Sequence, residues 1–164
     1  MKPIVAIAGC GQCGKTTLVA KLVAELSRRG HVIGTLKHDV HGFAMDHEGK
    51  DTWRHKQAGA RSVAIIGPGQ VAVIRDTPDE EFSVDSAIEL LGPVDLVIAE
   101  GFKRSPLPKI EVFSSVRNEG RLVCGDDPRL LAVAGDLPVD TKVPVFNWND
   151  IVMIADFVEE QLLL

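Results

Sequence analysis

The sequence of 164 residues is long enough to bury a core and short enough to form a single domain, residues 1–164. Its net charge of −5, with basic residues scattered along the chain, excludes electrostatic capture of nucleic acid. No apolar run approaches the roughly 20 residues that span a bilayer, and three cysteines do not make a secreted disulfide framework, so we expect a cytoplasmic protein without a membrane partner.

The first elements predict a parallel sheet. An apolar run over residues 2–9 ends in glycine, as a buried strand does, and Leu18, Leu22 and Leu26 recur at the spacing of a helix that ends before Gly30. Residues 31–38 predict a second strand. Because a strand, a helix and a strand follow one another, the connection is a right-handed crossover, and the fold class is α/β.

The middle of the chain alternates polar loops with short elements. The stretch from Asp39 to Ala60 is polar and rich in glycine, with a short helix expected around residues 50–58. Two apolar runs, residues 62–67 and 70–76, surround Pro68-Gly69 and predict an antiparallel hairpin that covers a sheet edge or builds a dimer contact.

The second half of the chain predicts further strands between two helices. A capping-box pattern that starts at Thr77, with Pro78, Asp79 and Glu80, predicts a helix up to residue 91. Strands are expected at residues 94–100, 109–113, 130–135 and 143–146, and an amphipathic helix at residues 151–162.

The loop between the first strand and the first helix matches the Walker A pattern G-x-x-x-x-G-K-T. Its glycines let backbone N–H groups turn toward phosphates, Lys15 reaches the β- and γ-phosphates, and the Thr16 hydroxyl binds Mg²⁺. The predicted nucleotide-binding residues here are Gly9, Cys10, Gly11, Gln12, Cys13, Gly14, Lys15, Thr16 and Thr17. The pattern predicts a P-loop NTPase fold, a mostly parallel central sheet flanked by helices, with an antiparallel β-hairpin.

Cys10 and Cys13 also form a C-x-x-C pair inside this loop. A zinc site needs two more ligands, and the chain has only one other cysteine. Two interpretations stay open: the cysteines are incidental small residues, or their oxidation restrains nucleotide binding. In the second case the helix N-terminus would lower the pKa of Cys13.

Glu100 closes the apolar strand over residues 94–100, which is where a Walker B acid that orients Mg²⁺ belongs. Four histidines, His38, His41, His47 and His55, lie in the stretch from Lys37 to His55. They predict either a transition-metal site or, because they lack helical metal-ligand spacing, a ligand-binding or switch loop.

The residues alone leave open which base the nucleotide carries. The N-K-x-D motif that reads guanine through an aspartate is absent. Asn149 and Asp150 are the comparable candidates for contact with the base, and either one also suits the N-cap of the last helix.

Walker A, "LKHDVHGF", "GKDTWRHKQAGA" and "VIAEGFK…PKIEVF" occur in this order, and with them the sequence resembles the MobB family of molybdopterin-guanine dinucleotide biosynthesis adaptor proteins. The resemblance implies a homodimer that binds GTP with Mg²⁺, hydrolyses it weakly, and assists the guanylyltransferase that joins GMP to molybdopterin. It also implies a functional cleft lined by Lys37, His38, Asp39, His41, Asp51, Lys103 and Lys109. Asp39 and Asp51 are the candidates for positioning water, and Lys15 and Glu100 complete the predicted catalytic set. Val40 departs from the family, which often has histidine there.

Other P-loop classes are alternatives. Dethiobiotin synthetase-like ATP-dependent ligases also place Lys and Glu-Gly at strand ends, but more glycines follow in them, where Phe102 and Lys103 stand here. Partitioning ATPases carry a lysine at the second position of the loop, which is Cys10 in this chain. A nucleotide-gated scaffold without hydrolysis differs from MobB only in turnover.

Overall fold

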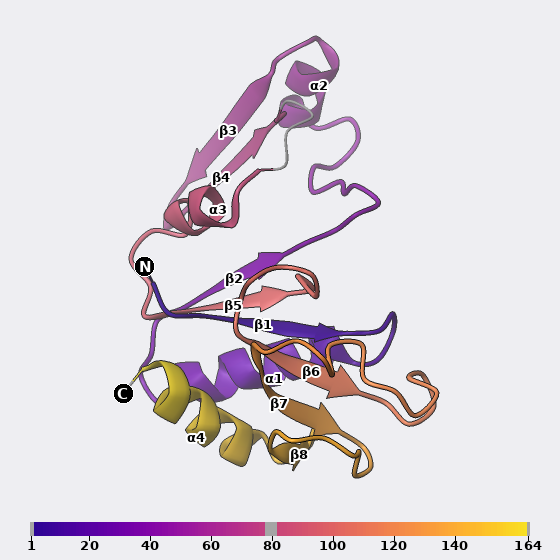
Figure 1. The fold of residues 1–164 in the computed structure, drawn as a ribbon. Helices are drawn as coiled ribbons and strands as arrows, with labels where there is room; N and C mark the ends of the chain where they lie inside the picture. Colours follow the sequence, from indigo (N-terminus) through magenta and orange to yellow (C-terminus); the bar gives the residue numbers. More distant parts are fainter. Residues whose placement is uncertain (1, 78–81, 164) are drawn as a thin grey trace. The chain divides into compact units, whose positions relative to one another are not determined.

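The computed structural model describes residues 2–77 and 82–163. The single domain expected from the length stays a prediction, and the chain divides into two compact units (Figure 1). One unit comprises Met1–His38 and Ala87–Leu164, and the other comprises Asp39–Ser86. The second unit is therefore an insertion in the chain of the first.

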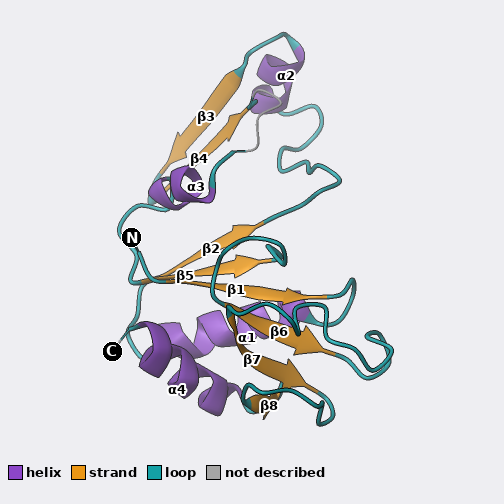
Figure 2. Cartoon of the chain, viewed as in Figure 1, coloured by secondary structure: helices purple, strands orange, loops and turns teal. Residues whose placement is uncertain are grey.

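The first unit is built on a six-stranded sheet whose paired strands all run parallel, in the order β2-β5-β1-β6-β7-β8 (Figure 2). The strands are β1 (Ile4–Gly9), β2 (Ile33–Lys37), β5 (Leu96–Glu100), β6 (Lys109–Phe113), β7 (Leu130–Gly135) and β8 (Val145–Asn147). Every residue of β1 and β6 is buried, as expected for central parallel strands. Because the strands are parallel, their carboxyl ends lie along one edge of the sheet.

Two helices cover one face of this sheet. Helix α1 (Lys15–Arg28) buries Leu18, Val19, Leu22 and Leu26, and α4 (Ile151–Leu162) buries Ile154, Ala155 and Val158. The two helices pack against each other as well as against the sheet. Gly30, with φ 100°, ends α1 in a Schellman motif, in which the Gly30 and His31 N–H groups donate to the carbonyls of Ser27 and Leu26.

Loops rather than helices cover the other face. A second core cluster there contains Ala8, Phe113 and Val133, with Leu122 and Val139 of the connecting loops packed against it. The connections from β5 to β6, β6 to β7 and β7 to β8 contain no helix. These loops therefore cross this face as they return from the carboxyl end of one parallel strand to the start of the next.

The second unit consists of α2 (Asp51–Gln57), the antiparallel hairpin β3 (Ser62–Gly67) and β4 (Gln70–Arg75), and the start of α3 (Val84–Glu89). The strands pair in register from Ser62 with Arg75 to Gly67 with Gln70, so Pro68-Gly69 forms a two-residue turn. The hairpin and the short helix were both predicted from the sequence.

The bounds of two elements in the structure differ from those predicted from the sequence. Helix α3 is shorter than the helix expected up to residue 91, and the predicted cap at Pro78, Asp79 and Glu80 lies outside the described residues. Strand β8 begins two residues later than expected, because Pro144 cannot donate a ladder hydrogen bond and accepts one from Val133 N–H instead. None of the helices in the described ranges has the length and apolar character to cross a membrane.

Candidate functional site

The loop of residues 9–16, here called the phosphate loop, connects β1 to α1 in a shape that requires its first glycine. Gly9 has φ 137°, and a Cβ atom there would lie 2.6 Å from the Val112 carbonyl oxygen and 2.9 Å from Cys13 Sγ. Gln12 and Gly14 also have positive φ, 56° and 96°. The loop turns tightly against β6, and only glycine fits at its start.

Lys15 is the first residue of α1, and its ammonium group folds over the phosphate loop. Lys15 Nζ lies 3.3 Å from the Gly9 carbonyl oxygen and also donates to the Cys10 carbonyl. The free N–H groups and positive dipole end of this 14-residue helix lie at the same place. The loop therefore combines a cation with backbone donors, which is the chemistry that binds phosphate.

Thr16 and Glu100 are brought together, as the motifs predicted. Glu100 is the last residue of β5, which pairs with β1, and its Oε1 accepts a 2.7 Å hydrogen bond from Thr16 Oγ1. Glu100 and the loop line a hollow of about 400 Å³. The loop residues in that lining are Gln12, Cys13, Gly14, Lys15, Thr16 and Thr17.

This hollow offers ligands that suit magnesium. A hydroxyl and a carboxylate oxygen are hard donors, and Mg²⁺ is usually held by one or two carboxylates, with waters and substrate phosphates completing its shell. Among the described residues, no group of three or more His, Cys, Asp or Glu side chains is arranged to hold a metal ion. Thr16 and Glu100 thus fit a nucleotide-dependent magnesium site.

A second hollow, of about 210 Å³, lies beside the first helical turn of α1. Gly14, Thr17, Leu18, Lys21, Val112, Trp148 and Asn149 line it. Asn149 was predicted from the sequence, whereas Lys21 and Trp148 were not, because a lysine on a helix and a partly buried tryptophan carry no signal of their own. Asp150 occupies the N-cap position of α4 without a side-chain capping bond and is absent from the lining.

The two loop cysteines are thiols with different surroundings. Cys13 is buried and its Sγ donates to the Cys10 carbonyl at 3.0 Å, and burial raises the pKa of Cys13 to about 11. The lowered pKa considered for Cys13 is therefore wrong, because desolvation of the thiolate outweighs the attraction of Lys15. Cys10 Sγ donates to Asn118 Oδ1 at 3.2 Å.

Asn118 joins the loop between β6 and β7 to the phosphate loop, and Glu111 fixes the same loop to β6. The Glu111 carboxylate is fully buried and accepts hydrogen bonds from the N–H groups of Val123 (2.6 Å) and Cys124 (2.7 Å). Asn118 Oδ1 also accepts from Ser114 N–H at 3.0 Å, beside its bond from Cys10. The sequence did not predict this network.

The cleft role predicted for Lys109 is contradicted by its burial. Lys109 is 0% exposed, and its Nζ lies 2.5 Å from Asp127 Oδ2 and 3.2 Å from the Ser105 carbonyl oxygen. The Lys109 ammonium lowers the pKa of Asp127. The buried Lys109 ammonium donates to the Ser105 carbonyl and to the partly exposed Asp127, so it supports the connecting loops and is not accessible to a nucleotide.

Comparison with known proteins identifies the family. Residues 4–136 match the family model described as MobB, "Molybdopterin guanine dinucleotide synthesis protein B". The chain belongs to the MobB family. The resemblance stated from the motifs is thus confirmed.

Relatives of the MobB family cover nearly the whole chain. The chain is 36% identical over 163 residues to the molybdopterin-guanine dinucleotide biosynthesis adapter protein of Haemophilus influenzae, covering 98% of this chain and 89% of that one. The Escherichia coli adapter protein is 33% identical over 166 residues, with coverages of 98% and 93%.

Solved MobB structures share the fold. The crystal structure of molybdopterin-guanine biosynthesis protein B superposes with a TM-score of 0.75 at 29% identity, covering 97% of this chain and 99% of that one. Bacillus subtilis MobB gives a TM-score of 0.75 at 28% identity, with 98% of each chain covered. The predicted fold class is therefore confirmed.

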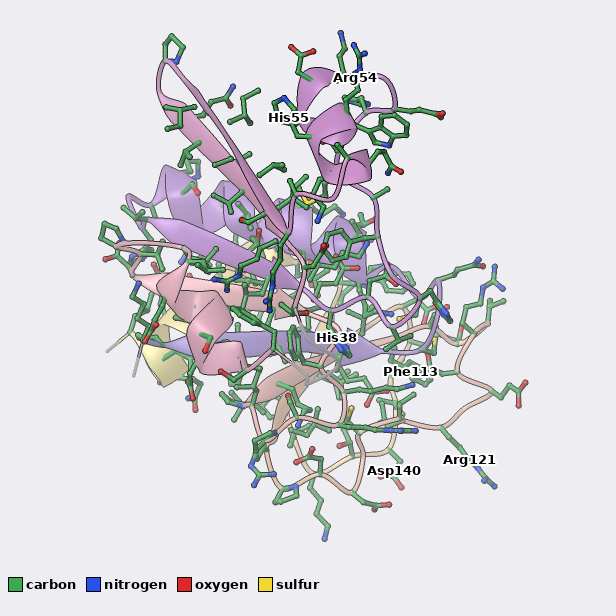
Figure 3. The ribbon with its side chains drawn as sticks, turned by 90° about the horizontal axis from the view of Figure 1, so that it is seen from above. His38, Arg54, His55, Phe113, Arg121 and Asp140 are labelled. Carbon is green, nitrogen blue, oxygen red and sulfur yellow. The ribbon has the colours of Figure 1, made fainter. Side chains whose placement is uncertain are left out.

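Three more of the residues that the MobB resemblance placed in a cleft lie in the first unit, and two of them adjoin Glu100. Lys37 ends β2 in register with Glu100, and the His38 N–H donates to the Glu100 carbonyl at 3.1 Å. The His38 ring packs 5.1 Å from the ring of Phe102, which has a positive φ of 53°. Lys103 follows in an exposed turn. In Figure 3, Arg121, from the loop after β6, extends away from the ribbon.

Asp39, His41 and Asp51 belong to the second unit. Asp39 Oδ1 accepts a hydrogen bond from His41 N–H at 2.9 Å, and Asp51 begins α2, the helix that also carries Arg54 and His55 (Figure 3). Their acidic side chains are exposed, and their roles stay predictions.

Proposed function

We propose that the chain is a cytoplasmic adapter of molybdopterin-guanine dinucleotide biosynthesis that binds GTP with Mg²⁺ and assists the guanylyltransferase that joins GMP to molybdopterin. The observation that carries the proposal is the Thr16–Glu100 hydrogen bond beside Lys15, in a chain that belongs to the MobB family. Both relatives are named as adapter proteins of molybdopterin-guanine dinucleotide biosynthesis, which supports a role for this chain in the same pathway.

The phosphate loop binds the triphosphate of GTP. Lys15 exchanges the carbonyl oxygens of Gly9 and Cys10 for β- and γ-phosphate oxygens, which are better acceptors because they carry charge. The backbone N–H groups at the start of α1 bind the remaining phosphate oxygens. Gly9 keeps the loop close to β6, so these donors converge on one place.

Thr16 and Glu100 hold the magnesium ion. The ion neutralises charge on the phosphates when it is bound. Thr16 supplies its hydroxyl as a ligand, and Glu100 orients the shell with its carboxylate. Hydrolysis is weak, with Asp39 and Asp51 as the residues that orient water.

The adapter acts as a homodimer through the hairpin β3–β4. Exposed apolar side chains lie on both faces of this two-stranded ribbon, among them Ile65 at 58%, Ile66 at 81% and Val71 at 66% exposure. An isolated hairpin is marginally stable in water, and apolar strands left unpaired favour pairing with another chain. A second copy of the chain offers the same apolar surface.

Calorimetry tests nucleotide binding. Wild-type protein binds GTP with Mg²⁺ more tightly than ATP, and Lys15→Ala loses binding of both, whereas Lys142→Ala, at an exposed lysine, retains it. A GTP-dependent pull-down of a molybdenum cofactor guanylyltransferase tests the adapter role. GTP affinity that is unchanged in Lys15→Ala contradicts the phosphate site, and tighter binding of ATP favours an ATP-dependent ligase instead.

A further inference from the structure

The hollow of about 210 Å³ beside α1 lies next to the phosphate loop and shares Gly14 and Thr17 with the hollow that Glu100 lines. Thr17 and Lys21 stand four residues apart, on one face of α1. Trp148 and Asn149, in the turn between β8 and α4, also line this hollow. A nucleotide whose phosphates bind residues 9–16 therefore has its base or sugar within reach of this hollow.

The turn that carries Asn149 is fixed by its own hydrogen bonds. Asn147 Oδ1 accepts from Asn149 N–H at 2.9 Å, and the Asn147 carbonyl accepts from Asp150 N–H at 2.9 Å. Trp148 N–H donates to the Gly135 carbonyl at 3.1 Å, which ties the turn to the end of β7. The backbone that carries Asn149 is thus held in place by three hydrogen bonds.

The Lys21–Asn149 pair fixes which groups the hollow presents. Lys21 Nζ lies 3.1 Å from Asn149 Oδ1. An ammonium group only donates, so the amide must turn its oxygen toward Lys21, which leaves the amide N–H₂ group and two ammonium N–H groups. Asp150, the carboxylate next along the chain, does not line the hollow. The side chains of this pair therefore offer donors to a base.

From this pair we infer that Lys21 and Asn149 select guanine over adenine by donating to O6 and N7, an inference that rests on the proposed nucleotide function. Guanine carries acceptors at both O6 and N7, whereas adenine carries a donor at N6 next to N7. An adenine N6 amino group facing this pair meets donors and loses its hydrogen bonds with water. Lys21 and Asn149 are specificity-determining residues of the site.

This reading differs from the aspartate-type reading of guanine in a measurable way. A carboxylate accepts from N1–H and the N2 amino group, so it discriminates against inosine, which lacks the N2 amino group. A donor pair reads O6 and N7, which inosine retains. Inosine triphosphate therefore binds this chain within about twofold of GTP, and ATP binds about tenfold or more weakly.

Competition calorimetry with GTP, inosine triphosphate and ATP, each with Mg²⁺, tests the inference. Lys21→Met and Asn149→Asp both reduce the ratio of GTP to ATP affinity about tenfold, the second because it replaces the donor with an acceptor. Lys142→Met removes an exposed lysine outside the hollow and keeps the ratio. Quenching of Trp148 fluorescence in a Trp53→Phe background reports occupation of the hollow directly.

The outcomes separate this inference from the function on which it rests. GTP binding that depends on Lys15 but keeps its ratio to ATP in Lys21→Met and Asn149→Asp overturns the donor pair alone. Strong discrimination against inosine triphosphate overturns it as well. If wild-type protein binds no nucleotide, the proposed function and this inference fall together.

Discussion

Thr16 and Glu100 connect the phosphate loop to the neighbouring strand by a 2.7 Å hydrogen bond between Oγ1 and Oε1. The two residues are 84 positions apart in the chain, but β1 and β5 are adjacent and parallel, so their carboxyl ends meet. The hydroxyl and the carboxylate thereby meet in the hollow that Lys15 also lines.

Glu100→Gln tests the role of this carboxylate. The glutamine keeps an oxygen that accepts from Thr16, so the fold is retained, but the charge that attracts Mg²⁺ is lost. We expect the Mg²⁺ concentration for half-maximal GTP binding to rise about tenfold. Glu160→Gln, at an exposed position of α4, is the matched control. Identical magnesium titrations for Glu100→Gln and wild-type protein would contradict the role.

Gly9→Ala tests the fit of the phosphate loop against β6. The added Cβ meets the Val112 carbonyl oxygen at 2.6 Å, so we expect the free energy of unfolding to fall by about 1–3 kcal/mol. Gly11→Ala is the control in the same loop, because a Cβ there has no neighbour within 4 Å. Urea denaturation measures the free energy of unfolding of both variants. Equal values would show that the loop moves away from β6 without loss of stability.

The hairpin β3–β4 gives a prediction for the oligomeric state. Ile66→Lys places a charge on an 81% exposed apolar position and should shift the protein from dimer to monomer in sedimentation velocity. Lys142→Glu, which changes charge elsewhere on the surface, leaves the dimer intact. A wild-type monomer at all concentrations, or a dimer unaffected by Ile66→Lys, would rule out this interface.

The stability of the protein in acid depends on Glu25, which pairs with Arg28 and Arg29 at the C-terminal end of α1. Hydrogen bonds from Arg28 and Arg29 lower the pKa of Glu25 from 4.5 to about 2. A carboxylate with a lowered folded-state pKa stabilises the fold above its unfolded pKa, and this contribution is lost as the pH falls from about 4.5 toward 2. The midpoint temperature of thermal unfolding should therefore fall less steeply with decreasing pH in Glu25→Gln than in wild-type protein over this window. Parallel curves would contradict the assignment.

Cysteine reactivity should follow burial. Burial raises the pKa of Cys13 and of Cys124 to about 11 each, so few thiolates form at pH 8. We expect iodoacetamide to modify both slowly in the native protein and rapidly in urea, as measured by mass spectrometry. Cys13 that reacts natively at the rate of an exposed thiol would contradict this expectation. Unchanged GTP affinity after peroxide treatment would argue against oxidation as a restraint on the phosphate loop.

Local patterns made much of the fold and site predictable. The phosphate loop is contiguous in sequence, and Glu100 follows an apolar run whose end must lie at the same sheet edge. The hairpin was predictable because Pro68-Gly69 separates two apolar runs. In each case, the prediction rests on a pattern within a short segment of the sequence.

Contacts between residues that lie far apart in the sequence were not predictable in this way. Lys21 and Asn149 are 128 positions apart, and no periodicity links a helix residue to a turn residue. Lys109 was assigned to the cleft because its charge suited phosphates, whereas Asp127, in a loop without regular structure, takes up that charge. Glu111 was overlooked because a buried carboxylate inside an apolar strand looks like an exposed one in the sequence.

The hydrogen bond from His38 N–H to the Glu100 carbonyl has a mechanical consequence. His38 is the last residue before the inserted unit, so tension on that insertion reaches this bond through a single peptide link. Pulling His38 away from β5 would loosen the end of the strand on which the Glu100 carboxylate is mounted. The inserted unit is thus joined covalently to His38, whose N–H donates to the strand end that carries Glu100.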